Sequence, residues 1–167
     1  ITHNGEPMIS LDSKAIESWH DYPKEDTRTL FVLNLLYPDY NYKAISVNID
    51  HMHPLQAIKD LKEQDLVDFP GLQPIHNYES LTTKERKALL KQRKEALKYV
   101  CNSLPNLQIL TEEDNKRKSD TPLSEWLQTH SNIPYLPKTD YNLRNIINFT
   151  IKRKALIHKT LCQMLHV

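Results

Sequence analysis

Acidic, imidazole and amide side chains stand at three points of the sequence whose spacing suits hydrolytic chemistry. Asp50 and His51 are adjacent, and Asn106 and Asn115 are nine residues apart. Hydrolysis of a phosphodiester needs a base that takes a proton from water, and a histidine with a pKa near about 6.5 suits neutral pH. A hard divalent ion, which prefers oxygen ligands, would supply positive charge to the phosphate. Asp50 and the side-chain carbonyl of Asn115 can provide two such ligands.

Two strands and a following segment are expected to hold these side chains. Residues 41–50 indicate a half-buried strand, because Ile45, Val47 and Ile49 alternate with polar residues. Residues 107–111 indicate a second short strand, and residues 112–118 continue as a helix or loop. Adjacent residues on a strand point to opposite sides, so two neighbouring side chains at the strand end can serve different tasks.

Three segments of this chain resemble the motif of the HNH, or His-Me finger, nuclease family. They are Asp50-His51-Met52-His53-Pro54, Asn106-Leu107-Gln108-Ile109-Leu110-Thr111 and Asn115-Lys116-Arg117-Lys118-Ser119-Asp120. The family has Asp-His near the end of one strand, Asn before the next strand, and Asn or His nine residues later. The third segment is similar to the HNH domain of CRISPR effector nucleases. The first is similar to the C-terminal nuclease domain of GmrSD-type restriction and defence proteins, as is a terminal helix carrying Arg153.

The resemblance implies a role for each matching residue. It implies that Asp50 and Asn115 bind the metal ion, Mg²⁺ or Mn²⁺, and that His51 is the general base. Asn106 would hold the loop that carries His51. Further residues could contact the substrate or its phosphates: His53, Lys116 and Lys118.

The sequence also departs from the family pattern. The last metal position is Asn115 rather than His, and the insertion between the two strands, about 55–104, is long. Cys101 and Cys162 are far apart and form no zinc-binding pair, so we expect two reduced thiols in a cytoplasmic protein.

Each candidate residue also has an ordinary structural interpretation. A strand-end Asp-His pair often belongs to a turn, and Asn106 after a proline could make an Asx hydrogen bond. Asn115 could cap the next helix, and His53 could make a structural hydrogen bond. The lysines beside Asn115 could simply be solvated. These interpretations explain the residues singly but not their joint spacing.

The remaining pattern predicts a mostly helical α+β domain around a small ββα-metal (HNH) core. We expect a single domain over 1–167, with a helical part over 1–40, the core over about 44–128 and a terminal helix over about 142–165. Helices are predicted from the following ranges: 13–22, 27–36, 55–66, 82 or 83 to 99 or 101, 122–128 and 142–165. Residues 1–10 are expected to be irregular, 67–80 and 131–140 to be loops, and Trp19 and Trp126 to be core residues.

Composition limits the class of protein. The 167 residues are 39% hydrophobic and 26% charged with a formal net charge of +1, as in an ordinary soluble domain. The two glycines argue against Gly-rich phosphate loops. No segment approaches the length of a membrane span. One local basic segment, residues 84–98, holds seven Lys or Arg and two Glu, which indicates a solvated face or a surface for a DNA backbone.

These observations predict a metal-dependent endonuclease domain that cleaves DNA in bacterial restriction or phage defence. It is expected to be a piece of a longer protein, with an N-terminal domain or subunit outside this chain. Two alternatives remain: a nucleic-acid-binding or scaffolding domain of the same fold that does not cut, and a helical protein-interaction domain in which the motif is a coincidence.

Overall fold

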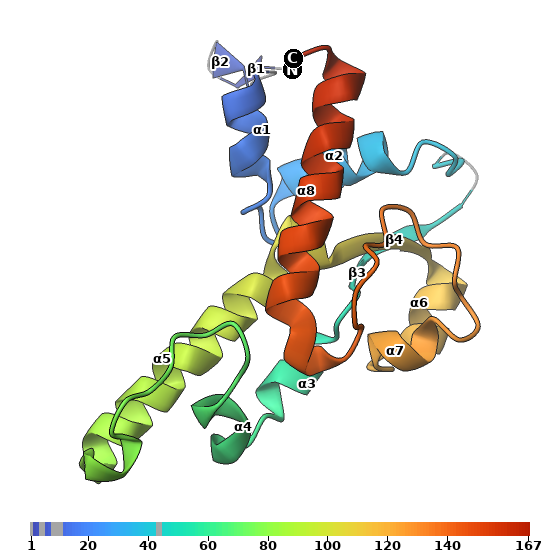
Figure 1. The fold of residues 1–167 in the computed structure, drawn as a ribbon. Coiled ribbons are helices and arrows are strands. Elements are labelled where there is room, and N and C mark those ends of the chain that lie inside the picture. The colour runs from blue at the N-terminus through green and yellow to red at the C-terminus, as the bar shows by residue number, and fades with distance from the viewer. Residues whose placement is uncertain (1, 4–5, 8–11, 43–44) are drawn as a thin grey trace.

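A long C-terminal helix, α8 (Ile146–Leu165), packs against α1, α2 and α5, which lie far from it in the sequence (Figure 1). The computed structural model describes residues 2–3, 6–7, 12–42 and 45–167. In these residues the fold is α+β and mostly helical, as predicted, with one pair of two-residue strands and one pair of five-residue strands. Among them, no helix is both long and apolar enough to pass through a membrane.

The longer pair of strands carries the predicted motif. β3 (Val47–His51) pairs antiparallel with β4 (Leu107–Thr111), from Val47 opposite Thr111 to His51 opposite Leu107. α6 (Glu112–Lys118) starts directly after β4, where the Thr111 hydroxyl accepts a hydrogen bond from the Asp114 amide at 3.1 Å. The second strand is thus confirmed, and of the helix or loop predicted over 112–118 the structure shows the helix.

The first strand is shorter at its start than predicted. Residues 43–44 lie outside the described residues, and the Ile45 amide donates to the carbonyl of Asn41 at 3.1 Å. The Tyr42 hydroxyl donates to the carbonyl of Tyr37 at 2.7 Å, which holds Tyr42 against the end of α2. The alternation of apolar residues extends further than the backbone pairing.

The N-terminal part forms two helices with aspartate caps. α1 (Ser13–Trp19) and α2 (Thr27–Leu36) begin after Asp12 and Asp26, whose carboxylates accept hydrogen bonds from backbone amides of the first turn. α2 has the predicted bounds, whereas α1 ends before the predicted Tyr22. β1 (Thr2–His3) pairs with β2 (Glu6–Pro7), so these residues are not irregular as predicted, and the rest of 1–10 lies outside the described residues.

The insertion between β3 and β4 forms a helical arm. It contains α3 (Leu55–Lys59), α4 (Glu63–Val67), a loop with the short 3-10 helix η1 (Tyr78–Ser80), and α5 (Thr83–Asn102). Thr82 caps α5 together with Glu85, and the helix starts within the predicted range of 82 or 83. The single helix predicted over 55–66 is wrong, because α4 restarts where the Lys62 amide donates to the Asp65 carboxylate at 2.9 Å.

The last elements surround the end of β3. They are the 3-10 helix η2 (Leu104–Asn106), α7 (Leu123–Trp126), the 3-10 helix η3 (Leu143–Asn145) and α8, and residues 131–140 form a loop as predicted. α7 is shorter than the predicted 122–128. Three hydrophobic clusters hold the fold together: one between α1, α2, β4 and α8, one between the insertion and the start of α8, and one formed by Met52, Leu123 and Phe149. Trp19 and Trp126 are buried, as predicted.

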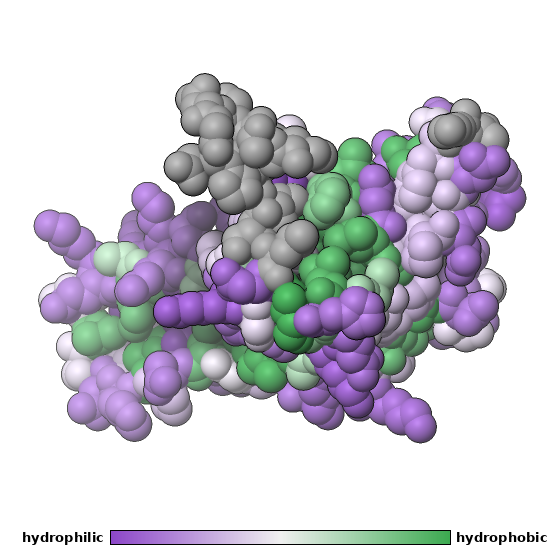
Figure 2. Space-filling model, turned by 90° about the horizontal axis from the view of Figure 1, so that it is seen from above, coloured by the Kyte–Doolittle hydropathy of each residue, from purple (hydrophilic) through white to green (hydrophobic). Residues whose placement is uncertain are grey.

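The surface is mixed in character. Seen from above, hydrophobic side chains are visible in the middle of the molecule, with hydrophilic ones around them (Figure 2). Cys101 and Cys162 are both free thiols, in agreement with the sequence.

Candidate active site

Four of the predicted site residues, Lys116 among them, line one open cleft. Asp50 and His51 reach it from the end of β3, and Asn115 reaches it from α6. The cleft has a volume of about 560 Å³, and residues at the start of α3 form another part of its wall. The order β3–insertion–β4–α6 thereby brings together residues that are up to 65 positions apart.

Asp50 uses one of its two carboxylate oxygens inside the protein. Its Oδ2 accepts a hydrogen bond from Gln108 Nε2 at 3.0 Å and forms an ion pair with Lys118 Nζ at 2.9 Å. Gln108 stands directly opposite Asp50 in the register of the strands. Oδ1 has no hydrogen-bond partner among the described residues, and the side chain is 12% exposed. One oxygen of this carboxylate is therefore free for an ion in the cleft.

Lys118 lies inside the fold rather than on the cleft surface. Its side chain is 0% exposed, and Nζ donates to the carbonyl of His51 at 2.7 Å as well as pairing with Asp50. The expectation that Lys118 contacts a phosphate does not fit this position. Instead, it ties the end of α6 to the end of β3.

His51 is held through one ring nitrogen. Its Nε2 lies 2.9 Å from Asn102 Oδ1, and Asn102 Nδ2 donates to Glu25 Oε2 at 2.9 Å. Because a carboxylate only accepts hydrogen bonds, Asn102 must turn its NH₂ group to Glu25 and its oxygen to His51. Nε2 therefore carries the proton, and Nδ1 is left with the lone pair that a base needs.

The local environments of His51 and Glu25 favour a neutral imidazole and an ionised carboxylate. Burial lowers the pKa of His51 below its ordinary value, although the hydrogen bond to Asn102 opposes the shift. The hydrogen bond from Asn102 lowers the pKa of Glu25, which is accordingly a carboxylate at neutral pH. His51 is then neutral at pH 7 and able to accept a proton.

Asn106 fixes the backbone that follows His51. It is fully buried, its Oδ1 accepts from the His53 amide at 3.0 Å, and its Nδ2 donates to the carbonyls of His53 at 3.0 Å and Cys101 at 2.8 Å. The Met52 amide also donates to the carbonyl of Asn106 at 2.7 Å. These are contacts that a role in holding the His51 loop requires, and the effect on activity stays a prediction.

His53 is buried away from the cleft. Its ring is 1% exposed and meets Phe149 edge-on, with 4.9 Å between the ring centroids. Burial lowers the pKa of His53 to about 3, so the ring is neutral at pH 7. Contact between His53 and a substrate in the cleft does not fit this position.

Three lysines line the cleft. Lys116 pairs with Glu112 one helical turn earlier at 2.6 Å, and it keeps the position that a phosphate contact would need. Lys24 and Lys59 also line the cleft, and the described residues contain no ion pair to either of them. These lysines share the cleft lining with the carboxylates of Asp50 and Asp120.

Part of the basic segment 84–98 serves the fold. Arg93 is 7% exposed and donates to the backbone carbonyls of Leu66 and Gln73, each at 2.6 Å. Lys94 donates to the carbonyl of Lys59 at 2.6 Å. The charge of this segment is thus only partly available to a nucleic acid.

Sequence reasoning missed Glu25, Asn102, Gln108 and the two lysines Lys24 and Lys59. Gln108 could have been found, because pairing the predicted strands places it opposite Asp50. Asn102 is 51 positions from His51, and Glu25 is 77 positions from Asn102, and no local pattern signals either contact.

Comparison with models of known protein families and with curated proteins finds no match for this chain. The oxygen donors themselves fit a hard ion such as Mg²⁺ or Mn²⁺, since Asp50 has a free carboxylate oxygen and Asn115 lines the same cleft.

Proposed function

We propose that this chain is a metal-dependent endonuclease domain of the HNH type, which hydrolyses DNA phosphodiester bonds on a ββα-metal core. One observation carries the proposal: Asp50, His51 and Asn115 line a single open cleft. Asn106 supports it through its bonds to the residues that follow His51.

His51 acts as the general base in this proposal. Its Nδ1 takes a proton from the attacking water, while Asn102 and Glu25 keep the opposite nitrogen protonated and the ring in place. Asp50 and Asn115 would hold the divalent ion, which supplies positive charge to the phosphate and to the leaving 3′ oxygen. The products would be 5′-phosphate and 3′-hydroxyl ends.

Lys118 makes metal binding depend on the substrate. Its buried ammonium group offsets the charge of Asp50, so the protein ligands alone offer the ion little net negative charge. A DNA phosphate in the cleft adds the missing charge and an oxygen ligand. The ion is accordingly expected to bind more tightly when DNA is present.

Lys24, Lys59 and Lys116 are proposed to contact the DNA backbone around the cleft. Three lysines give only modest affinity that does not depend on sequence, since each phosphate contact adds a small salt-sensitive increment. Sequence or modification specificity would then come from a domain or subunit outside this chain. A bacterial restriction or phage-defence protein in the cytoplasm, with cleavage in this chain and specificity elsewhere, fits this proposal.

The proposal is tested by cleavage of supercoiled plasmid DNA in Mg²⁺ or Mn²⁺, with an EDTA control. We expect nicked or linear DNA in either metal, none in EDTA, and ends that DNA ligase can rejoin. Cleavage that persists in EDTA, or no cleavage in either metal across a range of protein concentrations, would contradict it.

The ion pair between Lys118 and Asp50 favours a second candidate function. A scaffold that no longer cuts could keep this pair permanently, as a structural link between α6 and β3. Mn²⁺ binding in the presence of a short DNA duplex separates the two functions. An endonuclease takes up Mn²⁺ with the duplex, whereas the scaffold binds DNA without it.

A further inference from the structure

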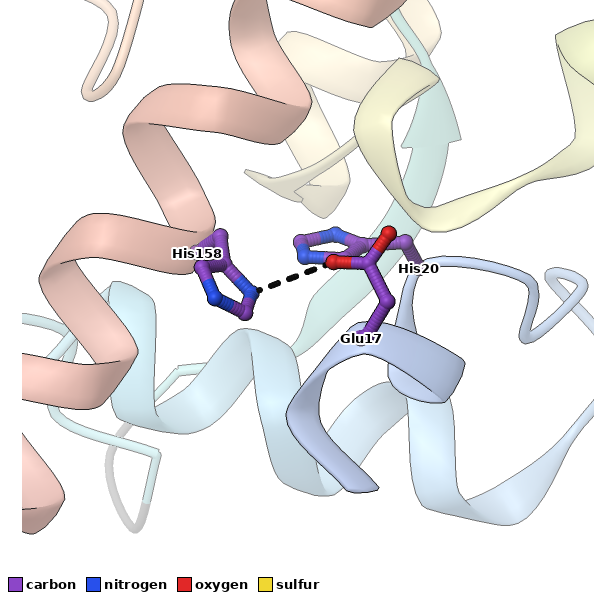
Figure 3. Close-up of side chains that lie close together, drawn as sticks. All are labelled: Glu17, His20 and His158. Carbon is purple, nitrogen blue, oxygen red and sulfur yellow. Dashed lines mark ion pairs between the residues drawn. The ribbon is translucent and has the colours of Figure 1, made fainter. Parts of the chain in front are cut away.

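Three potential metal ligands meet between the first and last long helices of the described chain, away from the cleft. Glu17 lies on α1, His20 lies just after it, and His158 lies on α8. Figure 3 shows the two imidazoles and the carboxylate directed toward one another. One ligand atom from each residue lies within 4.8 Å of the other two.

His20 is buried without any hydrogen bond. The residue is 1% exposed, and neither Nδ1 nor Nε2 has a partner among the described residues. A buried imidazole normally makes at least one hydrogen bond, because leaving its polar atoms unpaired costs free energy. Its ring centroid is 5.7 Å from that of His158 with a tilt of 42°, and this contact satisfies no nitrogen. A nitrogen lone pair of His20 is thus available to a ligand, because no other described group of the protein binds it.

His158 and Glu17 are arranged as ligands with their own supporting contacts. His158 Nδ1 lies 3.5 Å from Glu17 Oε2, while its Nε2 lies 3.5 Å from Cys162 Sγ. The other oxygen of Glu17 pairs with Lys154 Nζ at 2.5 Å. Metal-binding residues typically use one atom for the ion and the other for such an outer partner. Ligands of tetrahedral zinc stand about 3.3 Å apart, close to the spacing of this pair.

We propose that Glu17, His20 and His158 form a binding site for a Zn²⁺-class transition-metal ion, which links α1 to α8. Two imidazoles favour such ions over Mg²⁺, and water completes a four-coordinate shell. The site shares no residue with the cleft, so it stands whether or not the chain cuts DNA. The positive charge of Lys154 lowers the affinity of the site for a metal ion. Lys154 pairs with Glu17 Oε1, so Oε2 remains available to bind the ion.

A Co²⁺ titration of the whole metal-free chain tests this site, because four-coordinate cobalt absorbs strongly in the visible range. We expect one Co²⁺ per chain, displaced by Zn²⁺. Glu17→Gln and His158→Gln should weaken binding at least about tenfold. His76→Gln is the matched control, since His76 is exposed in the loop before η1. Glu17 is exposed, so its variant is expected to fold, and circular dichroism checks this.

Thermal unfolding gives an independent reading of the same site. Zn²⁺ should raise the melting temperature of the wild type and of Asp50→Ala, but not that of Glu17→Gln or His158→Gln. The proposal is overturned if the wild type binds neither Co²⁺ nor Zn²⁺, or if the Glu17 and His158 variants bind as the wild type does. Loss of the effect in Asp50→Ala alone would place the ion in the cleft instead.

Discussion

Oδ2 of Asp50 contacts Lys118 and Gln108, while Oδ1 has no partner among the described residues. The positive charge of Lys118 offsets the negative charge that Asp50 brings to the cleft. A buried lysine costs free energy unless a carboxylate such as that of Asp50, the proposed metal ligand, keeps it paired. The pair therefore holds α6 on β3 and at the same time weakens the attraction of the free protein for a cation.

Lys118→Met tests whether the ion pair with Asp50 stabilises the fold and weakens cation binding. We expect the free energy of unfolding to fall by about 3 kcal/mol, because a buried ion pair loses one partner. We also expect Mn²⁺ to bind more tightly in the absence of DNA, since Asp50 then keeps its full charge. Calorimetric titration measures the affinity, and Lys91→Met on the exposed face of α5 is the control. Equal Mn²⁺ affinity in the wild type and in Lys118→Met would refute the charge argument.

In the proposed mechanism, Asn102 sets the pH range in which His51 can act as the base. The imidazole must be neutral to accept a proton, so cleavage is lost as pH falls through the pKa of His51. Because burial lowers that pKa, the acidic limb of the rate profile is expected below about pH 6.5. Asn102→Asp places a carboxylate against Nε2, raises the pKa and moves the limb to higher pH. A limb that stays in place in this variant would remove Asn102 from the positioning role.

At the residue scale, the spacing of the motif was sufficient to predict that Asp50, His51 and Asn115 would lie together. Asp50, His51 and Asn115 line the cleft because strand ends and a helix start place them there. His53 and Lys118 belong to the same motif, yet their side chains turn inward. Which side of the backbone a residue faces after a strand ends depends on tertiary contacts, and the motif does not encode it.

Among the elements, α8 and β4 are joined by one buried arginine. Arg153 is 0% exposed and donates to the carbonyls of Pro105 at 3.0 Å and Leu107 at 2.7 Å, and to the Tyr37 hydroxyl at 3.1 Å. These two carbonyls flank Asn106. The arginine therefore fixes the start of β4 and, through it, the loop that carries His51.

Arg153→Met is expected to lower the free energy of unfolding by about 2–5 kcal/mol, because it leaves buried carbonyls without donors. Urea unfolding measures the change, and Lys152→Met, at the exposed neighbouring position of α8, is the control. If both variants unfold alike, the link between α8 and β4 carries no stability.

The bounds of the elements could be predicted where local signals are strong. The predicted bounds of α2, α5 and β4 differ from those of the structure by at most a few residues. The break between α3 and α4 could not be predicted, because Lys94 from α5 satisfies the carbonyls of Lys59 and Leu61 at 2.6 and 3.2 Å. Such hydrogen bonds from a distant helix replace those that a continuous helix would make.

Among the residues whose burial is described, two histidines are buried, His20 and His53, and they lie in different places. Burial lowers the pKa of His20 to about 4 and that of His53 to about 3, whereas in the unfolded chain both titrate near about 6.5. Between these values the unfolded chain binds more protons than the folded one, so acid favours unfolding. Stability is complete above about pH 6.5 and is lost as pH falls toward 4.

Urea unfolding of the metal-free chain is expected to show this loss, up to about 1.4 kcal/mol per pH unit for each group. His53→Phe keeps an aromatic ring beside Phe149 and should make the dependence on pH shallower, while His76→Phe should not. A free energy of unfolding that does not change between about pH 6.5 and about pH 4.5 would contradict the burial of both rings.

The arrangement of the whole molecule exceeds what local patterns encode. β3 and β4 pair across an insertion that packs on the start of α8, and α1 meets α8 from the other end of the described chain. These contacts create both the hydrogen bonds of Asn102 to His51 and to Glu25 and the cluster around His20. Their partners are separated by dozens of residues, so only packing brings them together.

The most direct measurement is the single-turnover rate of plasmid cleavage in Mg²⁺ by the wild type, His51→Ala and His76→Ala. Loss of a general base is expected to slow cleavage by about 10²–10⁴-fold in His51→Ala, with binding of DNA and metal retained. His76→Ala should cut at the wild-type rate. If His51→Ala cuts as fast as the wild type, His51 is not the base and the proposed active site is wrong.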